Sequence, residues 1–174
     1  MRRSNLLRLV GCDATTLDNL TRRDALPFPG PERRWTTYSY DHVFQLGLAL
    51  ELAGAGCDQR LAAAQVRAGY SDLLAAAAAT SSSRQDVRFG FVVDFASDGE
   101  EAASGIMPLI GRPAQLAAMR REYKRMARAQ RGFLRGELTI NATYVLSAIK
   151  GRSTYAERTS DEMVKLSALF GVKG

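Results

Sequence analysis

The chain has 174 residues, 46% of them hydrophobic, which is enough for a packed core in one domain or two small ones and excludes wholesale disorder. Its net charge of +6 and isoelectric point near 9.7 favour an anionic partner. Two cysteines and one histidine exclude a disulfide framework and a zinc site made of Cys and His alone. No stretch approaches the roughly 18 apolar residues of a membrane-spanning helix. The first residues lack the pattern of a signal peptide, so we expect a cytoplasmic protein without a membrane partner.

The first segment predicts two short helices around a tight turn. A first helix follows Ser4 and ends at Gly11. Asp13 is a good N-cap for a second helix, because its carboxylate can accept from the free N–H groups of the first turn. Leu17 and Leu20 lie three residues apart, on one face of that helix. This order is the helix-turn-helix arrangement.

The rest of the second helix carries polar side chains of the types that read bases and bind phosphates. These side chains are Thr15, Thr16, Asp18, Asn19, Arg22 and Arg23. Four residues then stop the helix and force turns, namely Pro27, Pro29, Gly30 and Pro31. Arg33 and Arg34 lead from that turn into a short extended run, Trp35 to Tyr38. We therefore expect a basic wing after the second helix.

Two more helices follow the wing. One is capped by Ser39 or Asp41 and runs to Gly54, and another follows from Asp58. The order of helix, turn, helix, wing, helix and helix resembles the MerR-type winged-helix DNA-binding domain over about residues 5–70. The matching pieces are Gly11–Leu17, Leu26–Pro27, Arg34–Ser39 and Leu52–Gly56.

The resemblance implies how this segment would contact DNA. The second helix would enter the major groove, where Asn19 can pair with adenine and Arg22 with guanine or phosphate. Arg33 and Arg34 would lie on the wing, beside the minor groove or its phosphates. Trp35 would pack under the wing or contact DNA. The full set of implied DNA-binding residues is Thr15, Thr16, Asn19, Arg22, Arg23, Arg33, Arg34 and Trp35.

Three residues and one missing element differ from the family pattern. Asp24 replaces a turn Gly, which is tolerable because Asp visits left-handed conformations. Asp18 stands where an Arg usually follows Thr-Leu, and Thr36 replaces an Arg of the wing. No heptads follow residue 70, where MerR regulators usually continue into a dimerising coiled coil. Excisionases and small terminase subunits share this domain type. Two alternatives therefore stay open: a phage excisionase or terminase role, and a winged helix used for protein interaction without DNA.

The chain from residue 71 has a different pattern. Segment 71–85 predicts a further helix and a Ser-rich linker. Residues 86–96 alternate and predict a strand. The alternating apolar side chains are Val87, Phe89, Phe91, Val93 and Phe95. The short apolar run Ile106–Ile110 contains Pro108, so it is at best an edge strand.

The longest helical pattern runs from Arg112 to about Phe133. Its apolar stripe consists of Leu116, Met119, Tyr123, Met126 and Phe133. Away from that stripe lies a possible second basic surface, formed by Arg121, Lys124, Arg125 and Arg128. Such a face can be a solvated surface, a second nucleic-acid contact or a docking site for an acidic partner.

The last part of the chain predicts one more strand and one more helix. Residues 137–149 alternate after Gly136, which favours a strand. Thr159 and Glu162 have the spacing of a capping box that opens a final helix. Residues 86–174 thus predict a small strand–helix–strand–helix domain with a basic helix at 112–133, in which we recognise no family.

Together these patterns predict an α+β protein with a winged helix at 1–70, a linker at 71–85 and a second domain at 86–174. No P-loop, dinucleotide fingerprint, nucleophile elbow or metal-ligand cluster is visible, so we expect neither an enzyme nor a bound cofactor or metal. We expect a transcriptional regulator that reads double-stranded DNA. A homodimer is expected because one short helix covers too few base pairs to find a site. The C-terminal half would supply dimerisation, or bind an effector or a protein partner.

Overall fold

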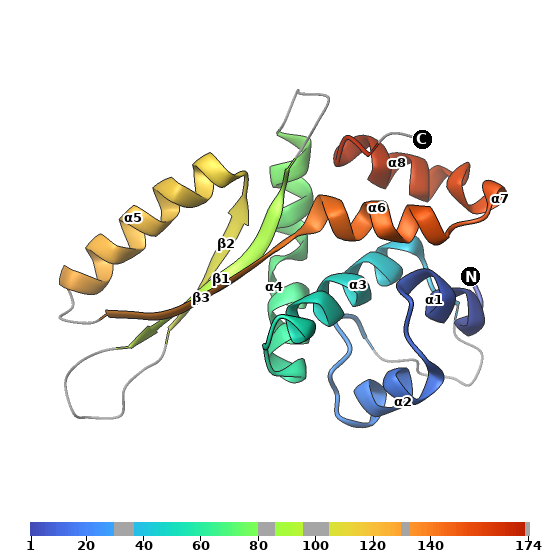
Figure 1. Cartoon of the computed structure of the whole chain (residues 1–174), viewed down its shortest axis with the longest axis horizontal. Helices are drawn as coiled ribbons and strands as arrows, with labels where there is room; N and C mark the ends of the chain where they lie inside the picture. The colour runs from blue at the N-terminus through green and yellow to red at the C-terminus, as the bar shows by residue number, and fades with distance from the viewer. Residues whose placement is uncertain (30–36, 80–85, 96–104, 130–132, 173–174) are drawn as a thin grey trace.

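The computed structural model describes residues 1–29, 37–79, 86–95, 105–129 and 133–172 (Figure 1). Within these residues the chain has eight helices and one three-stranded antiparallel sheet, which confirms the predicted α+β class. In chain order the elements are α1 (Arg3–Val10), α2 (Ala14–Arg22), α3 (Tyr40–Gly54), α4 (Gln59–Ala78), β1 (Arg88–Phe95), β2 (Ile106–Gly111), α5 (Pro113–Ala129), β3 (Phe133–Asn141), α6 (Ala142–Arg152), α7 (Tyr155–Arg158) and α8 (Asp161–Leu169).

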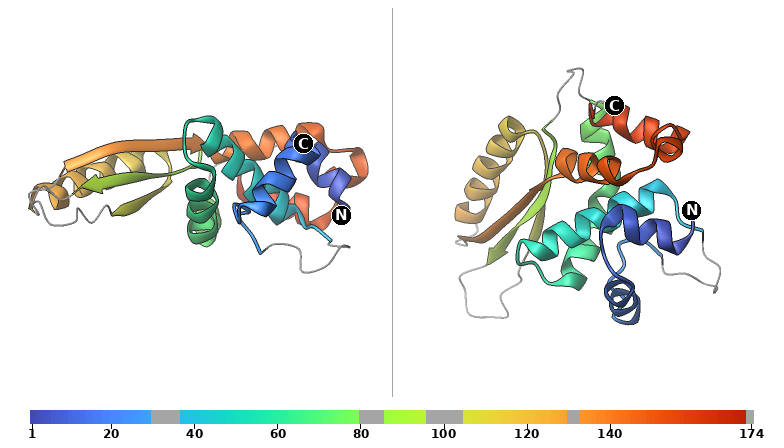
Figure 2. Two further views of the ribbon diagram at one scale, coloured as in Figure 1. Left: turned by 90° about the horizontal axis from the view of Figure 1, so that it is seen from below. Right: turned by 45° about the vertical axis from the view of Figure 1, so that its right-hand side comes forward.

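The elements form two parts, which we call the helical lobe and the sheet arm. The helical lobe consists of α1–α4 and α6–α8, and the sheet arm consists of β1, β2, α5 and β3. Figures 1 and 2 show the arm extending from one side of the lobe, with α5 along one face of the sheet. The chain leaves the lobe after α4 to form the arm. It returns at residue 142, where β3 leads directly into α6.

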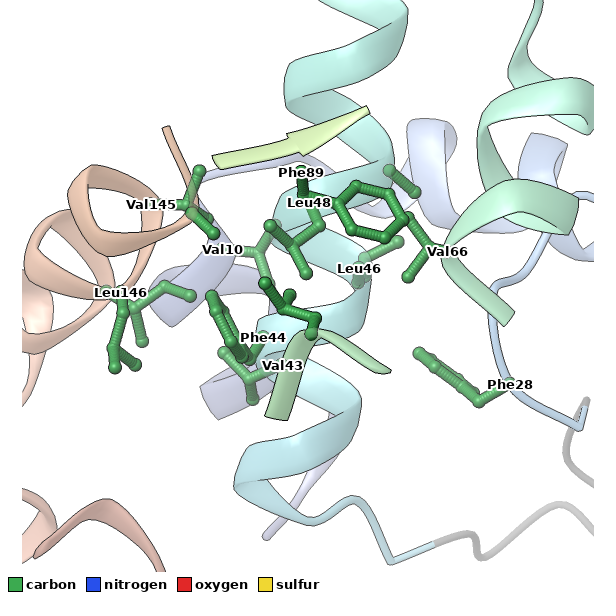
Figure 3. Close-up of a cluster of buried hydrophobic side chains, with 14 of the residues drawn as sticks. Val10, Phe28, Val43, Phe44, Leu46, Leu48, Val66, Phe89, Val145 and Leu146 are labelled. Atoms are coloured by element: carbon green, nitrogen blue, oxygen red, sulfur yellow. The ribbon is translucent and has the colours of Figure 1, made fainter. Parts of the chain in front are cut away.

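One hydrophobic core fills the helical lobe and draws on both ends of the chain. Leu6 of α1, Phe44 of α3 and Phe170 after α8 are fully buried and belong to one continuous cluster. The rings of Phe44 and Phe170 meet edge to face, with centroids 5.1 Å apart. Figure 3 shows Val10, Phe44 and Leu146, from α1, α3 and α6, in this cluster. The core therefore crosses the domain boundary predicted at residue 70.

The sheet arm is organised by the alternation of β1, which confirms the predicted strand. β1 is the central strand in the order β2-β1-β3. Phe89 and Phe91 belong to the core of the lobe. Val92, on the opposite face of the strand, packs with Leu109 of β2 and Leu116 of α5 in a separate, much smaller cluster. The arm thus has its own small core between the sheet and α5.

The two edges of the sheet are poor templates for a further strand. β2 is an edge strand as predicted, and Pro108 offers no N–H there. The carbonyl oxygen of Pro108 accepts from the phenol of Tyr123 at 2.8 Å. On the other side, the pairing of β1 with β3 shifts register between Val93 and Asp94. Such irregularities blunt an edge, so addition of a strand to this sheet is disfavoured on both sides.

The prediction of a strand through Ile149 is wrong beyond Asn141. The side-chain oxygen of Asn141 accepts from the N–H of Tyr144 at 2.9 Å and caps α6. The buried residues of α6 recur at helical spacing, and they are Ala142, Val145, Leu146 and Ile149. Alternation and helical spacing share some of these positions, so the apolar pattern alone did not separate a strand from a helix here.

Two helix boundaries also differ from the prediction. α4 continues without a break past Tyr70 to Ala78, whereas separate helices were predicted. Gly69 lies buried in it against β1, where an added Cβ would be 2.9 Å from the ring of Phe89. Close packing on the sheet thus offsets the low helix propensity of glycine. At the other boundary α5 ends at Ala129, because Phe133 already belongs to β3.

The capping box predicted at Thr159 and Glu162 does not form, and a capping box is found five residues earlier, at Thr154 and Glu157. Thr154 accepts from the N–H of Glu157, and the Glu157 carboxylate accepts from the N–H of Thr154 at 2.7 Å, which opens the short helix α7. α8 begins at Asp161 without a side-chain cap bond. The carboxylate of Glu162 instead accepts from the N–H of Tyr40 at 2.9 Å. The C-terminal helix is therefore tied to the start of α3.

Candidate nucleic-acid interface

α2 is held with one face buried and the opposite face exposed. Asp13 caps it as predicted, because its carboxylate accepts from the N–H of Thr16 at 2.6 Å. This bond holds the pKa of Asp13 below its ordinary value. Leu17 and Leu20 are only 2% and 3% exposed and anchor the helix on the lobe. Asp24 follows the helix with a φ of 51°, a left-handed conformation that Asp tolerates.

A tight turn joins α1 to α2. Gly11 ends α1 with a φ of 79°, and its N–H donates to the carbonyl of Leu7 at 2.8 Å. Only Cys12 and Asp13 then separate Gly11 from the first residue of α2. The predicted pair of short helices around a turn is thus present in the structure.

Two arginines that cross between α1 and the C-terminal helices hold this turn in place. The guanidinium of Arg8 bonds to the carbonyl of Arg152 and to the carboxylate of Glu157. The guanidinium of Arg152 donates to the carbonyls of Leu9 at 3.3 Å and Val10 at 3.0 Å, near the end of α1. It also lies over Gly11, where an added Cβ would be 3.0 Å away. We call Arg8, Arg152 and Glu157 the arginine clamp.

The electrostatics of the arginine clamp are those of a charge-assisted network. Burial alone would raise the pKa of Glu157, but the bonds from Arg8 and from Thr154 outweigh it and hold that pKa below its ordinary value. The charged carboxylate of Glu157 is therefore the form present at neutral pH. The end of α1 is thus held by residues that are distant in the sequence. Arg8 and Arg152, for example, are 144 positions apart.

The predicted base-reading residues lie on or beside the exposed face of α2. Thr15, Arg22 and Arg23 are exposed, and Thr16 and Asn19 are half-buried. The side-chain oxygen of Asn19 accepts from the guanidinium of Arg22 at 2.6 Å, which orders the two side chains relative to each other. The structure thus brings the helical part of the predicted site together.

Asp18, the acidic residue on this face, has a cationic partner. The guanidinium of Arg3 lies 2.6 Å from its carboxylate and also donates to the carbonyl of Ala14 at 3.2 Å. The two side chains are 46% and 53% exposed, so the pair contributes at most about 1 kcal/mol to stability. On the surface, Arg3 offsets a negative charge of Asp18 that would repel phosphate.

Two arginines of α4, which were not among the predicted site residues, extend the same surface. Arg60 donates to the carbonyl of Arg23 at 2.8 Å, and Arg67 donates to the carbonyl of Leu26 at 2.6 Å. They lie seven residues apart on one face of a helix, a spacing that could have flagged them. We call Thr15, Asn19, Arg22, Arg23 and Arg60 the α2 surface.

The predicted wing residues Arg33, Arg34 and Trp35 lie outside the described residues, as does Thr36. The residues on either side of that segment are well anchored. Phe28 stacks on His42 with centroids 4.5 Å apart, and Tyr38 meets both rings edge to face. The terminal ammonium of Met1 bonds to the carbonyl of Tyr38, whose N–H donates to the carbonyl of Met1 at 3.0 Å.

His42 has a defined role in this aromatic cluster. Ser39, one of the two predicted caps, caps α3, and its N–H donates to Nδ1 of His42 at 3.2 Å. Burial lowers the pKa of His42 below its ordinary value near 6.5, although Asp41 and Glu162 act in the opposite direction. The neutral ring is therefore the form that accepts this bond at neutral pH.

The second basic surface predicted on α5 lies on the sheet arm, away from the α2 surface (Figure 1). Arg121, Lys124, Arg125 and Arg128 are all exposed. Arg125 pairs with Glu122 at 2.6 Å. The structure therefore separates the two predicted basic surfaces rather than joining them into one.

In the described part of the chain, no helix is long and apolar enough to cross a membrane. The same residues hold no group of three or more His, Cys, Asp or Glu side chains that could bind a metal ion. Comparison of the chain with protein-family models found no match. Comparisons with curated proteins and with solved structures found no match either.

Proposed function

We propose that this protein binds double-stranded DNA through the α2 surface and acts as a transcriptional regulator. The observation that carries the proposal is the arrangement of α2 itself. Its buried side is fixed by Leu17 and Leu20, and its outer side presents Arg22 and Arg23 beside Arg60 of α4. A helix held in this way fits the major groove, which is wide enough to admit one.

The side chains of the α2 surface have the chemistry that duplex DNA requires. Arg22 and Arg23 can pair with guanine or phosphate, and the free N–H groups of Asn19 suit adenine or phosphate oxygen. Thr15 lies exposed in the first turn of the helix, where its hydroxyl can donate to a phosphate oxygen. Arg60 adds a cation beside the C-terminal end of α2. The proposal assigns base contacts to Asn19 and Arg22 and backbone contacts to the other residues.

The wing is proposed to hold the DNA next to α2. Arg33 and Arg34 would reach the minor groove or its phosphates, and Trp35 would support them or stack at the backbone. The aromatic cluster of Phe28, Tyr38 and His42 supports this role, because it fixes both ends of the segment that carries these residues.

A homodimer is part of the proposal. A single α2 covers only a few base pairs, and paired half-sites are the usual way to reach a useful specificity. The blunted edges of the sheet make strand addition a poor route to such a dimer. A dimer would therefore form through helices or on the DNA itself.

Selection of bound duplexes from a random DNA pool tests the proposal. The full chain is expected to enrich a short motif that recurs as two related half-sites. A pool with no enriched motif at low salt would contradict sequence-directed binding. A single motif without a second half-site would leave DNA reading in place and remove the homodimer.

A protein-interaction role is the second candidate, and the charge of α2 favours it. Asp13, Asp18 and Asp24 accompany Arg22 and Arg23 in this short segment. If the chain binds no duplex at low salt, where electrostatic attraction is strongest, the α2 surface is expected to bind a protein instead.

A further inference from the structure

The exposed face of α5 carries four cations in one stripe. Arg121, Lys124, Arg125 and Arg128 stand at positions i, i+3, i+4 and i+7, which share one face of a helix. From the first to the last of them the helix rises by about 10 Å. α5 as a whole has five basic residues and one acidic residue. We call these four cations the α5 stripe.

The rotation of α5 about its axis is fixed, so the stripe cannot turn toward the sheet. Leu116 and Ala127 are buried on the sheet side, at 1% and 2% exposure. The phenol of Tyr123 donates to the carbonyl of Pro108 in β2 at 2.8 Å. Arg120 pairs with Glu137 of β3 through its guanidinium. Three kinds of contact therefore hold the stripe on the outer face of the arm.

The positive charge of the stripe is largely uncompensated within the described residues. Glu122, the acidic residue of α5, is paired with Arg125. Glu137 of the neighbouring strand is paired with Arg120, which is not part of the stripe. In the described part of the chain, Arg121, Lys124 and Arg128 have no ion pair. Uncompensated cations on a projecting surface attract polyanions.

We infer that the α5 stripe binds the phosphate backbone of duplex DNA, independently of sequence and at a place separate from the α2 surface. This inference deepens the proposed function, because the same duplex would be held at two places. Three of the four cations are Arg, whose planar guanidinium matches phosphate oxygens in a bidentate way. The stripe is long enough to reach more than one phosphate of a strand.

The surroundings of the stripe favour a duplex over the other polyanions. Single strands are held by exposed aromatic rings, and Tyr123 of α5 is half-buried and bonded to Pro108. A protein–protein interface is usually centred on a buried core that is more apolar than its rim. Among the described residues of α5, the large apolar side chain that is exposed is Met126, at 42%. Charge without an apolar or aromatic platform is the chemistry of backbone contact.

Fluorescence anisotropy on a labelled duplex of fixed, unselected sequence, over a series of salt concentrations, tests this inference. The triple variant Arg121→Gln, Lys124→Gln, Arg128→Gln is expected to bind it at least tenfold more weakly at low salt. Each lost phosphate contact lowers the slope of log affinity against log salt by about 0.9. Arg121→Lys with Arg128→Lys keeps the charge and is expected to keep that slope.

A matched control compares two exposed lysines, one on the stripe and one outside it. Lys124→Gln on the stripe and Lys165→Gln on α8 remove the same charge from the chain. Only Lys124→Gln is expected to weaken binding. Equal weakening by both variants would show a net-charge effect and overturn the inference. Binding of polyglutamate to the stripe, without binding of the duplex, would make the occupant an acidic protein and overturn it as well.

These measurements distinguish a failure of the α5 inference from a failure of the α2 proposal. If Arg22→Ala abolishes binding to a selected sequence while the triple α5 variant keeps the full salt slope, the α2 proposal stands and the α5 inference is wrong. If the unselected duplex binds through the α5 stripe and no motif is enriched from a random pool, the inference stands and sequence reading by α2 is wrong.

Discussion

The helical lobe and the sheet arm differ in how the chain holds them together. The lobe is closed by both ends of the sequence, since α6–α8 return after the arm to pack on α1 and α3. Its core is one cluster that runs from Leu6 to Phe170. The arm is a continuous excursion between α4 and α6, and its own buried cluster has only Val92, Leu109 and Leu116. We expect the lobe to unfold as one unit and the arm to open at a lower cost.

The largest expected effect comes from the centre of the lobe. Phe44→Ala removes a fully buried ring that packs against Phe170 and should lower the free energy of unfolding by about 3–5 kcal/mol. Urea denaturation measures this. Val164→Ala, at a side chain that is 50% exposed on α8, is the control and should change stability by less than about 0.5 kcal/mol.

The second effect tests whether the sheet arm unfolds separately from the helical lobe. Leu109→Ala empties part of the small cluster and should cost about 2–4 kcal/mol, felt mainly by the arm. Amide hydrogen exchange is expected to lose protection in β2 and α5 while α3 keeps its protection. Ile106→Ala, at a side chain that is 37% exposed on the same strand, is the matched control. Equal loss of protection in α3 would show that lobe and arm unfold together.

The third effect concerns the arginine clamp. Arg152→Ala removes the donors to Leu9 and Val10 and should lower stability by about 1–3 kcal/mol. Exchange of the amides in α1 and α2 should rise, and affinity for a selected duplex should fall with it. Arg158→Ala is the control, because Arg158 bonds to the carbonyls of Lys150 and Ser153 in the C-terminal segment and not to α1. If the two variants affect α1 equally, the clamp has no special role in holding the turn.

The smallest effect is a dependence of stability on pH. Burial holds the pKa of His42 below its ordinary value near 6.5. Below pH 6.5 the unfolded chain therefore binds a proton that the folded chain does not, and stability falls as the pH falls. His42 is the only histidine in the sequence, so its titration can be followed by NMR without overlap. His42→Gln should remove this part of the pH dependence, and an unchanged profile would contradict the assigned role of the ring.

The elements that were predicted well from the sequence are those with strong local signals. α2 and β1 were predicted from local signals, namely the Asp13 cap with Leu17 and Leu20, and the alternation around Phe89. The structure confirms both elements, because these signals agree with the packing that each element finds. The edge position of β2 followed from Pro108 for the same reason.

The features that were not predicted depend on contacts between distant parts of the chain. α6 was predicted as a strand, because Ala142 and Leu146 fit both the alternating and the helical period, whereas Tyr144 of the predicted strand face is 64% exposed. Arg60 and Arg152 act through carbonyls of other helices, and the sequence does not show which helices will meet. The implied roles of Arg33, Arg34 and Trp35 stay predictions, since these residues lie outside the described part of the chain.

The most direct test of the central claim measures the affinity of the full chain for one duplex selected from the random pool. Arg22→Ala is compared with Lys165→Ala, which removes one charge from the exposed face of α8. If α2 reads DNA, Arg22→Ala should bind roughly tenfold or more weakly, in line with the loss of one good base contact, and Lys165→Ala should bind like the unmodified chain. Equal affinity of the Arg22→Ala variant and the unmodified chain for the selected duplex would contradict the claim.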